Sequence, residues 1–206
     1  MDLKNKKVTI YGAGKSGVSA LRLLTEQGAI CSIVSRDWSN LSEIQTMISQ
    51  DSCFDDQDDE IFSNSDLIIL SPGISLENPN LQKAISKKVP IISEIELAFQ
   101  FVNCPVIGIT GTNGKTTTVS FIREILDKTE LKVFTGGNIG IPFCDAITSN
   151  IEWDLVLLEL SSFQLETIVN FRPHIAMILN ISHNHGERYN SLLDYTKAKF
   201  NIIKNM

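Results

Sequence analysis

The sequence predicts an α/β fold built on parallel sheets, and two features of its 206 residues support this. Short apolar runs rich in β-branched residues recur without polar alternation, which is typical of strands buried on both faces of a parallel sheet. Stretches with helical periodicity lie between these runs, so strand and helix alternate throughout. We expect strands at 8–11, 29–34, 66–70, 89–92, 105–110, 132–135, 154–160 and 175–181, and helices at 16–26, 116–126 and 192–203.

The composition is that of a globular protein, with 43% hydrophobic and 20% charged residues. A net charge of −6 argues against a nucleic-acid partner. No apolar run reaches the roughly 18–20 residues of a membrane span, and no signal-peptide core follows the first residues, so no membrane partner is expected. The four cysteines are scattered without a C-x-x-C pair, and we expect reduced, mostly packed thiols in a cytoplasmic protein.

The chain divides into two groups of predicted strands, joined by the segment 92–105, which holds a helical turn. We therefore expect a first domain at 1–93 and a second at 94–206. The segment 51–60 carries six acidic residues and no basic one. It lacks the glycine and the spacing of a calcium loop, so a solvated loop or helix edge is the favoured interpretation over a cation site.

The first glycine loop, GAGKSG at 12–17, directly follows a predicted strand and opens a predicted helix. In this context G-x-G-x-x-G lets the backbone approach a diphosphate at the helix N-terminus, although a tight turn gives the same pattern without a ligand. A dinucleotide-binding domain also needs an acid after the second strand, where this chain has Ser35, Arg36 and Asp37. Arg36 would suit a 2′-phosphate, so an NAD(P)-dependent oxidoreductase is weakened rather than excluded.

The second glycine loop, GITGTNGKT at 108–116, lies between another predicted strand and helix. Its N–H groups would form an anion nest, Lys115 would reach terminal phosphates, and the Thr116 hydroxyl would ligate Mg²⁺. The spacing is GxxGKT, since Ile109 occupies the first glycine position of the full motif. A glycine-rich turn that happens to carry a lysine is the alternative. The pair of loops predicts one domain that holds a nucleoside-diphosphate substrate and a second that consumes ATP.

Two candidate cation ligands follow at the ends of later strands. Glu159 closes a predicted strand, where a buried carboxylate is costly unless it is paired or bound to a metal such as Mg²⁺. The alternative is a buried glutamate bonded to a helix N-terminus or an arginine. His183 is expected to be a surface histidine. His185 follows a strand that we expect to neighbour that of Glu159, which places it to reach the same cation.

Lys199 lies on an otherwise apolar stripe of the last predicted helix, formed by Leu192, Tyr195, Ile202 and Ile203. Lys197 and Lys204 point elsewhere. A lysine on such a face either lets its stem cover apolar surface while its head reaches water, or serves a site that the helix faces. Both interpretations stay open.

Seven motifs together resemble the Mur ligases, over essentially the whole chain. They are GAGKSG (12–17), SPGI (71–74), GTNGKT (111–116), GGNIGIP (136–142), LELSSFQLE (158–166), ILNISHNH (178–185) and YTKAK (195–199). GTNGKT marks the whole superfamily. GGNIG with LELSSFQLE is more specific to members that add D-glutamate to UDP-N-acetylmuramoyl-L-alanine.

The resemblance implies a Rossmann-like domain for the UDP group, a central P-loop ATPase domain and a C-terminal domain. It also implies that ATP phosphorylates the substrate carboxylate and that the amine of D-glutamate then attacks the acyl phosphate, in a monomeric enzyme of cytoplasmic peptidoglycan synthesis. Family members are more than twice this length. We therefore expect a fragment with an incomplete central domain and no C-terminal domain, inactive alone, and a binding module without catalysis is the alternative.

The resemblance also assigns site residues. The catalytic residues would be Lys115, His185 and Lys199. Those binding ATP would be Gly111, Thr112, Asn113, Gly114, Lys115, Thr116 and Thr117. Those holding Mg²⁺ would be Thr116, Glu159, His185 and a carbamylated Lys199. Those contacting the UDP-substrate would be Gly14, Lys15, Ser16, Ser35, Arg36, Ser71, Pro72, Gly73, Asn138, Ser161 and Gln164. Two segments depart from the family pattern: Ser35 stands where an acid is common, and 184–188 reads NHGER instead of DHxDR.

Overall fold

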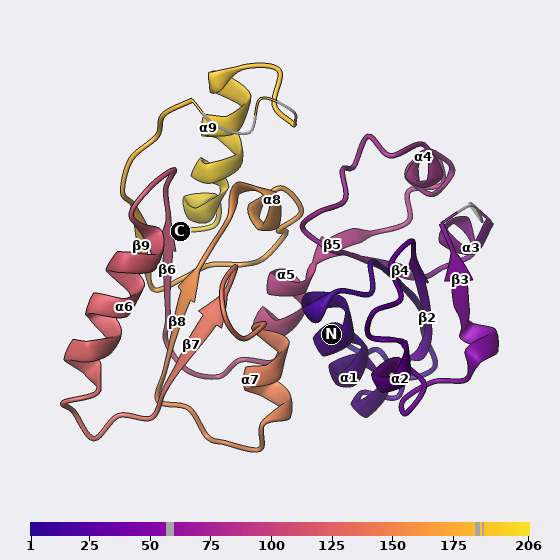
Figure 1. Cartoon of the computed structure of the whole chain (residues 1–206), viewed down its shortest axis with the longest axis horizontal. Helices are drawn as coiled ribbons and strands as arrows, with labels where there is room; N and C mark the ends of the chain where they lie inside the picture. The colour runs from indigo at the N-terminus through magenta and orange to yellow at the C-terminus, as the bar shows by residue number, and fades with distance from the viewer. Residues whose placement is uncertain (57–59, 184–185, 187) are drawn as a thin grey trace.

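The computed structural model describes residues 1–56, 60–183, 186 and 188–206, and it shows two sheets whose described strand pairs are all parallel (Figure 1). The predicted α/β class is therefore confirmed. No described helix has the length and apolar character needed to cross a membrane. The four cysteines are free thiols, as expected, with Cys31 and Cys144 buried.

The first sheet has the strand order β3-β2-β1-β4-β5. Its strands are β1 (Lys7–Tyr11), β2 (Ile30–Ser35), β3 (Cys53–Asp55), β4 (Leu67–Leu70) and β5 (Ile91–Ser93). Its helices are α1 (Lys15–Glu26), α2 (Leu41–Ile44), α3 (Glu60–Ser63) and α4 (Pro79–Ser86), with a 3₁₀ turn at Gln50–Ser52. Alternate side chains enter opposite cores: Val8 and Ile10 join the cluster of α1, and Tyr11 joins that of α3 and α4. Both faces are thus buried, which explains the uninterrupted apolar runs.

The second sheet has the strand order β7-β8-β6-β9. Its strands are β6 (Val106–Thr110), β7 (Val133–Gly137), β8 (Leu155–Glu159) and β9 (Ile175–Ile178). Its helices are α6 (Lys115–Leu126), α7 (Cys144–Thr148), α8 (Ser162–Leu165) and α9 (Leu192–Phe200), followed by a 3₁₀ turn at Asn201–Ile203. β6 lies between β8 and β9, so the expectation that the strand before His185 neighbours that of Glu159 is wrong. The strand that carries the phosphate loop occupies the position between them.

The eight strands expected from the sequence are all present, but two local predictions need correction. Residues 53–55 of the acidic segment form β3 and pair with β2, so the interpretation as a solvated loop or helix edge is wrong there. The acidic residues around these three positions leave no apolar run, so the sequence pattern did not predict this strand. β9 ends at Ile178 rather than at 181, because the backbone then turns away and the Asn180 carbonyl accepts a hydrogen bond from the Thr112 amide.

The two sheets are joined through α5 (Glu94–Phe99), which lies between them in Figure 1. Glu96 is buried and accepts hydrogen bonds from the backbone amides of Val169, Asn170 and Phe171 at 2.8–2.9 Å. Glu94 is buried as well and accepts one from the Cys144 amide at the start of α7. One continuous apolar cluster contains side chains of both sheets. The boundary near residue 94 stays a prediction.

Replacing Glu94 by glutamine is expected to remove a pH dependence of stability. Burial raises the pKa of Glu94 from its ordinary 4.5 to about 7, against hydrogen bonds from the Cys144 and Phe143 amides. The folded chain therefore binds this proton more tightly than the unfolded chain, and stability is lost as the pH rises from about 4.5 to about 7. The loss amounts to roughly 3 kcal/mol at about 1.36 kcal/mol per pKa unit.

Urea unfolding of the wild-type chain and of Glu94→Gln between pH 4.5 and 8 measures this difference. The glutamine variant should lose less free energy of unfolding over that range than the wild type. The exposed Glu77→Gln is the matched control and should follow the wild type. If the free energies of unfolding of the wild type and of Glu94→Gln change in parallel with pH, the raised pKa of Glu94 is contradicted.

Candidate functional site

A cavity of about 390 Å³ lies at the carboxyl ends of β1, β2 and β4, where the strand order reverses direction. This is the position at which open α/β sheets bind nucleotides. Five of the residues predicted to contact the UDP group line it: Gly14, Ser35, Arg36, Ser71 and Gly73. The described residues that line this cavity do not include Lys15, Ser16 or Pro72. Lys15 lines a different cavity.

Close packing by itself requires glycine at two positions of the first loop. Gly12 has a φ of +107°, and a Cβ there would lie 2.6 Å from the Ser71 hydroxyl oxygen. A Cβ at Gly17 would lie 1.9 Å from the Gly12 carbonyl oxygen. Gly14 has open space instead. The pattern therefore has a structural cause at Gly12 and Gly17, and the ligand argument rests on the cavity.

The sequence did not reveal a buried network at the rim of this cavity. The Asp56 carboxylate accepts a hydrogen bond from the Tyr11 hydroxyl and forms an ion pair with Arg36. The Asn78 side chain donates to the Tyr11 oxygen at 2.9 Å. Burial, and then the bond to Asp56, raises the pKa of Tyr11 to about 12. Arg36 is thus held beside the cavity by an acid 20 residues away in sequence, which no local spacing could indicate.

The second glycine loop lies between β6 and α6, as predicted. The Thr112 amide donates to the Asn180 carbonyl at 3.0 Å and the Asn113 amide to the Asn180 side chain at 2.9 Å, so the loop is fixed against the end of β9. Gly114 precedes α6 with a φ of +81°. The amides of the first turn have no intrahelical acceptor, which makes the turn an anion-binding position. Thr117 is exposed in this turn.

The Lys115 ammonium folds back over the loop, donating to the carbonyls of Gly111 at 2.9 Å and Thr112 at 3.0 Å. The Lys199 ammonium donates to the same Gly111 carbonyl at 2.8 Å. Two positive charges thus converge on one carbonyl of the phosphate loop. Such a convergence attracts an anion with several negative charges.

Glu159 is the last residue of β8, as predicted, and its side chain faces the phosphate loop. It is 1% exposed. One carboxylate oxygen accepts from the Thr116 hydroxyl at 2.8 Å and the other from the Asn138 side chain at 2.8 Å. Both donors are neutral side chains rather than an arginine, and Thr116 lies in the first turn of α6, so the alternative of a glutamate bonded at a helix N-terminus stays open beside the metal. The structure brings together Thr116, Asn138 and Glu159.

Lys199 is 1% exposed, and its ammonium lies 4.6 Å from the centre of the Tyr195 ring. Its head is therefore buried beside the phosphate loop, and the interpretation as a stem with its head in water is wrong. Burial, and then the charge of Lys115, lowers the pKa of Lys199 to about 8, although Glu159 acts in the opposite direction. Of the predicted stripe, Tyr195 and Ile202 are buried, but Ile203 is 43% exposed because the helix changes to a 3₁₀ turn.

Other predicted site residues have less direct geometry. Ser161 caps α8 and exchanges hydrogen bonds with Gln164, which is buried, so their role toward a ligand stays a prediction. His183 is exposed, as expected. His185 lies outside the described residues. Among the residues that the structure does describe, no three His, Cys, Asp or Glu side chains form a metal-binding cluster.

Two family models account for most of the sequence. The model described as "Mur ligase MurD-like, N-terminal domain" matches residues 6–93, and "Mur ligase middle domain" matches residues 109–206. The chain belongs to the Mur ligase family.

Curated relatives place it near one branch of the Mur ligases. The chain is 38% identical over 211 residues to a UDP-N-acetylmuramoylalanine–D-glutamate ligase of Trichlorobacter lovleyi and 40% identical over 211 residues to one of Geotalea daltonii. It is 39% identical over 212 residues to one of Clostridioides difficile. Each match covers 100% of this chain but only 46–47% of the relative. The chain thus spans about half the length of these Mur ligases.

Solved Mur ligase structures share the fold. A ligase of Neisseria meningitides that acts on UDP-N-acetylmuramate and a peptide matches with a TM-score of 0.59 at 17% identity, over 98% of this chain and 68% of that one. A UDP-N-acetylmuramate–alanine ligase of Thermotoga maritima matches with a TM-score of 0.55 at 22% identity, over 98% and 47% of the two chains. At these identities the likeness shows the fold.

Proposed function

We propose that this Mur ligase chain is the UDP-substrate-binding and ATP-binding part of an enzyme that joins D-glutamate to UDP-N-acetylmuramoyl-L-alanine. The observation that carries the proposal is the convergence of Lys115, Thr116, Glu159 and Lys199 at the carboxyl ends of β6 and β8. The names of the 38–40% identical relatives support the substrates. The cytoplasmic location and monomeric state expected from the sequence belong to the same proposal.

ATP would bind with its phosphates at the first turn of α6. The free amides of that turn and the Lys115 ammonium are the donors that a triphosphate needs. Lys115 now bonds to the carbonyls of Gly111 and Thr112, and phosphate oxygens would replace these acceptors. Residues 111–117 would form the phosphate site.

The residues at this site fit Mg²⁺. Glu159 and Thr116 supply the oxygen ligands that Mg²⁺ prefers, and Mg²⁺ usually needs only one or two carboxylates in addition to phosphate and water. The buried Glu159 carboxylate accepts its described hydrogen bonds from neutral donors, which leaves its charge available to a cation. When bound, Mg²⁺ neutralises charge on the phosphates during transfer.

Lys199 would act in this site as a carbamate rather than as an ammonium. A pKa of about 8 leaves an appreciable neutral fraction near pH 7.5, and carbamylation requires the neutral amine. The modification would convert one of the two cations at the Gly111 carbonyl into an anion. It would thereby suit a site that also holds Glu159 and Mg²⁺.

In the proposed reaction the substrate carboxylate attacks the γ-phosphorus of ATP, the bond from that phosphorus to the bridging oxygen breaks, and ADP leaves. The amine of D-glutamate then attacks the acyl phosphate and expels inorganic phosphate. The two glycine loops hold the two reactants, and correct positioning supplies up to about 7–11 kcal/mol of such catalysis. Asn138, on the loop that follows β7, binds Glu159 and would face the substrate between the two sites.

Two other functions remain to be separated by experiment. A binding module would hold the same ligands without catalysis, and an NAD(P)-dependent oxidoreductase would use the first glycine loop alone. Calorimetric titration of the 206-residue chain with UDP-N-acetylmuramoyl-L-alanine, UDP and NADPH separates the oxidoreductase from the other two, and a product assay on a longer form of the protein separates the binding module from the ligase. The proposal predicts that the first ligand binds more tightly than UDP and that NADPH gives no heat. Binding of NADPH without binding of either uridine nucleotide would overturn it.

The 206 residues alone are expected to form no D-glutamyl amide. The chain spans about half the length of its curated relatives, and positioning of the amine in the proposed reaction is expected to need a protein of their full length. Mass spectrometry of a reaction with ATP, Mg²⁺, UDP-N-acetylmuramoyl-L-alanine and D-glutamate tests this. Product from the purified chain would contradict the expectation.

A further inference from the structure

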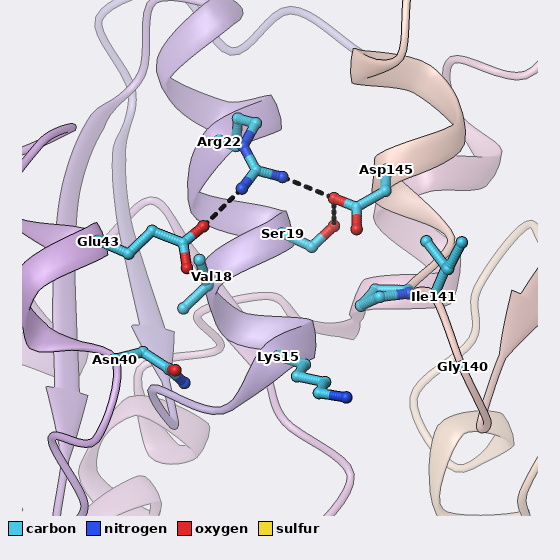
Figure 2. Close-up of a pocket in the computed structure, with 10 residues that line it drawn as sticks. Lys15, Val18, Ser19, Arg22, Asn40, Glu43, Gly140, Ile141 and Asp145 are labelled. Atoms are coloured by element: carbon cyan, nitrogen blue, oxygen red, sulfur yellow. Dashed lines mark hydrogen bonds and ion pairs between the residues drawn. The ribbon is translucent and has the colours of Figure 1, made fainter.

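A second cavity, of about 230 Å³, lies between the two halves of the chain. Its walls come from residues 15–22 of α1 with Asn40 and Glu43 at α2 on one side, and from residues 140–145, which run into α7, on the other (Figure 2). Lys15 lines this cavity, and its side chain extends toward the loop that carries Gly140 and Ile141. The cavity therefore separates the first glycine loop from the loop that follows β7.

A polar cluster at this cavity connects α1 to α7. One Asp145 carboxylate oxygen accepts from the Ser19 hydroxyl at 2.6 Å and from the Arg22 guanidinium at 2.8 Å. The other end of the Arg22 guanidinium bonds to Glu43 at 2.6 Å, so Arg22 lies between two carboxylates (Figure 2). The Arg22 and Asp145 side chains are 38% and 28% exposed. A single pair this exposed contributes little, but Asp145 has two donors and one of them, Ser19, is buried.

The first turn of α7 is also held from α5 and by apolar packing. The Cys144 amide donates to the buried Glu94 carboxylate. Phe143, Cys144 and Ala146 belong to the same apolar cluster as Ala20 and the leucines of α1. The start of α7 therefore has a fixed place on the first half of the chain.

The loop before α7 connects the position of α7 to that of the phosphate site, because this loop is short and closely hydrogen-bonded. The Gly137 amide donates to the Ile141 carbonyl at 2.8 Å, and a Cβ at Gly136 would lie 2.1 Å from that carbonyl oxygen. The Asn138 amide and side chain both donate to Glu159, each at 2.8 Å. A displacement of Asp145 would thus move the loop that contacts Glu159.

We infer that Asp145, held by Ser19 and Arg22, is a positioning residue that sets the distance between the first nucleotide cavity and the phosphate loop. It thereby selects a ligand long enough to reach from that cavity to the loop after β7, beside the Lys115 site: a nucleoside diphosphate that carries an extended acidic group. The identity of that ligand rests on the proposed function, whereas the positioning rests on the contacts alone.

Hydrogen exchange tests the positioning without any ligand. The double variant Ser19→Ala/Arg22→Met removes both donors to Asp145 and leaves every residue of the second half unchanged. Exchange at the Gly137 and Asn138 amides should become about tenfold faster, because loss of such bonds weakens the loop locally. Glu43→Gln is the matched control, since it neutralises only the other carboxylate at Arg22, within the first half, and should change exchange less than about twofold. Arg22→Met alone retains the buried Ser19 and should give a smaller acceleration.

Calorimetry tests whether the contacts of Asp145 select the longer ligand over UDP. In the wild type and in Glu43→Gln, UDP-N-acetylmuramoyl-L-alanine should bind more tightly than UDP, and in the double variant this ratio should fall by about tenfold while UDP affinity is kept. Equal exchange rates at 137–138 in the double variant and the control would overturn the inference. If the wild type binds neither uridine compound, the proposed function fails, and the exchange result still decides whether Asp145 positions the loop.

Discussion

Replacing Lys115 by alanine is expected to weaken binding of Mg²⁺–ATP by about 100-fold or more and to leave binding of the UDP-substrate unchanged. A charge-assisted hydrogen bond contributes about 1.5–3 kcal/mol, and the ammonium would make more than one to the phosphates. The two glycine loops belong to different sheets, so the substitution should not alter the first cavity. Calorimetric titration with each ligand measures both effects.

Lys128→Ala is the matched control, because this lysine is exposed just beyond the end of the same helix. It should bind both ligands as the wild type does. Equal loss of the two ligands in a folded Lys115→Ala chain would show that the loops do not act as separate sites. The phosphate role of Lys115 would then be wrong.

Replacing Lys199 by alanine is expected to reduce turnover about 1000-fold in a longer, active form of the protein. An ammonium about 4 Å from the doubly charged Mg²⁺ would be repelled by about 8 kcal/mol at an effective dielectric of about 20, so the proposed carbamate is the form that supports the metal. Removing the side chain removes that anion. Added bicarbonate or a short carboxylic acid should restore part of the activity by occupying the vacated space.

The helix should survive this change, because alanine is a better helix former than lysine and Tyr195 and Ile202 remain buried. Circular dichroism checks this point. Lys197→Ala, exposed on the same helix, is the control and should retain full turnover. Normal turnover of Lys199→Ala without any added acid would remove Lys199 from the metal site.

Much of the fold follows from local patterns. The apolar runs predicted eight strands because both faces of each sheet are buried, and the two glycine loops marked the strand–helix junctions where the candidate sites lie. β3 was missed because it is three residues long and acidic around its end. The place of β9 beside β6 could not be predicted, since strand order depends on packing rather than on sequence order.

The candidate site was predicted only in part for the same reason. Periodicity placed Lys199 on an apolar face, but only the fold shows that its head reaches the Gly111 carbonyl, 88 residues away in sequence. The bond between Asn138 and Glu159 and the cluster of Ser19, Arg22 and Asp145 join residues on different elements. Such contacts leave no spacing in the sequence.

One chain is proposed to hold two different ligands at once, one at each glycine loop. Native mass spectrometry of the 206-residue chain with UDP-N-acetylmuramoyl-L-alanine and a non-hydrolysable Mg²⁺–ATP analogue tests it most directly. We expect a ternary complex with one molecule of each ligand, and loss of only the ATP analogue in Lys115→Ala. Displacement of one ligand by the other, with no ternary complex at saturating concentrations of both, would contradict it.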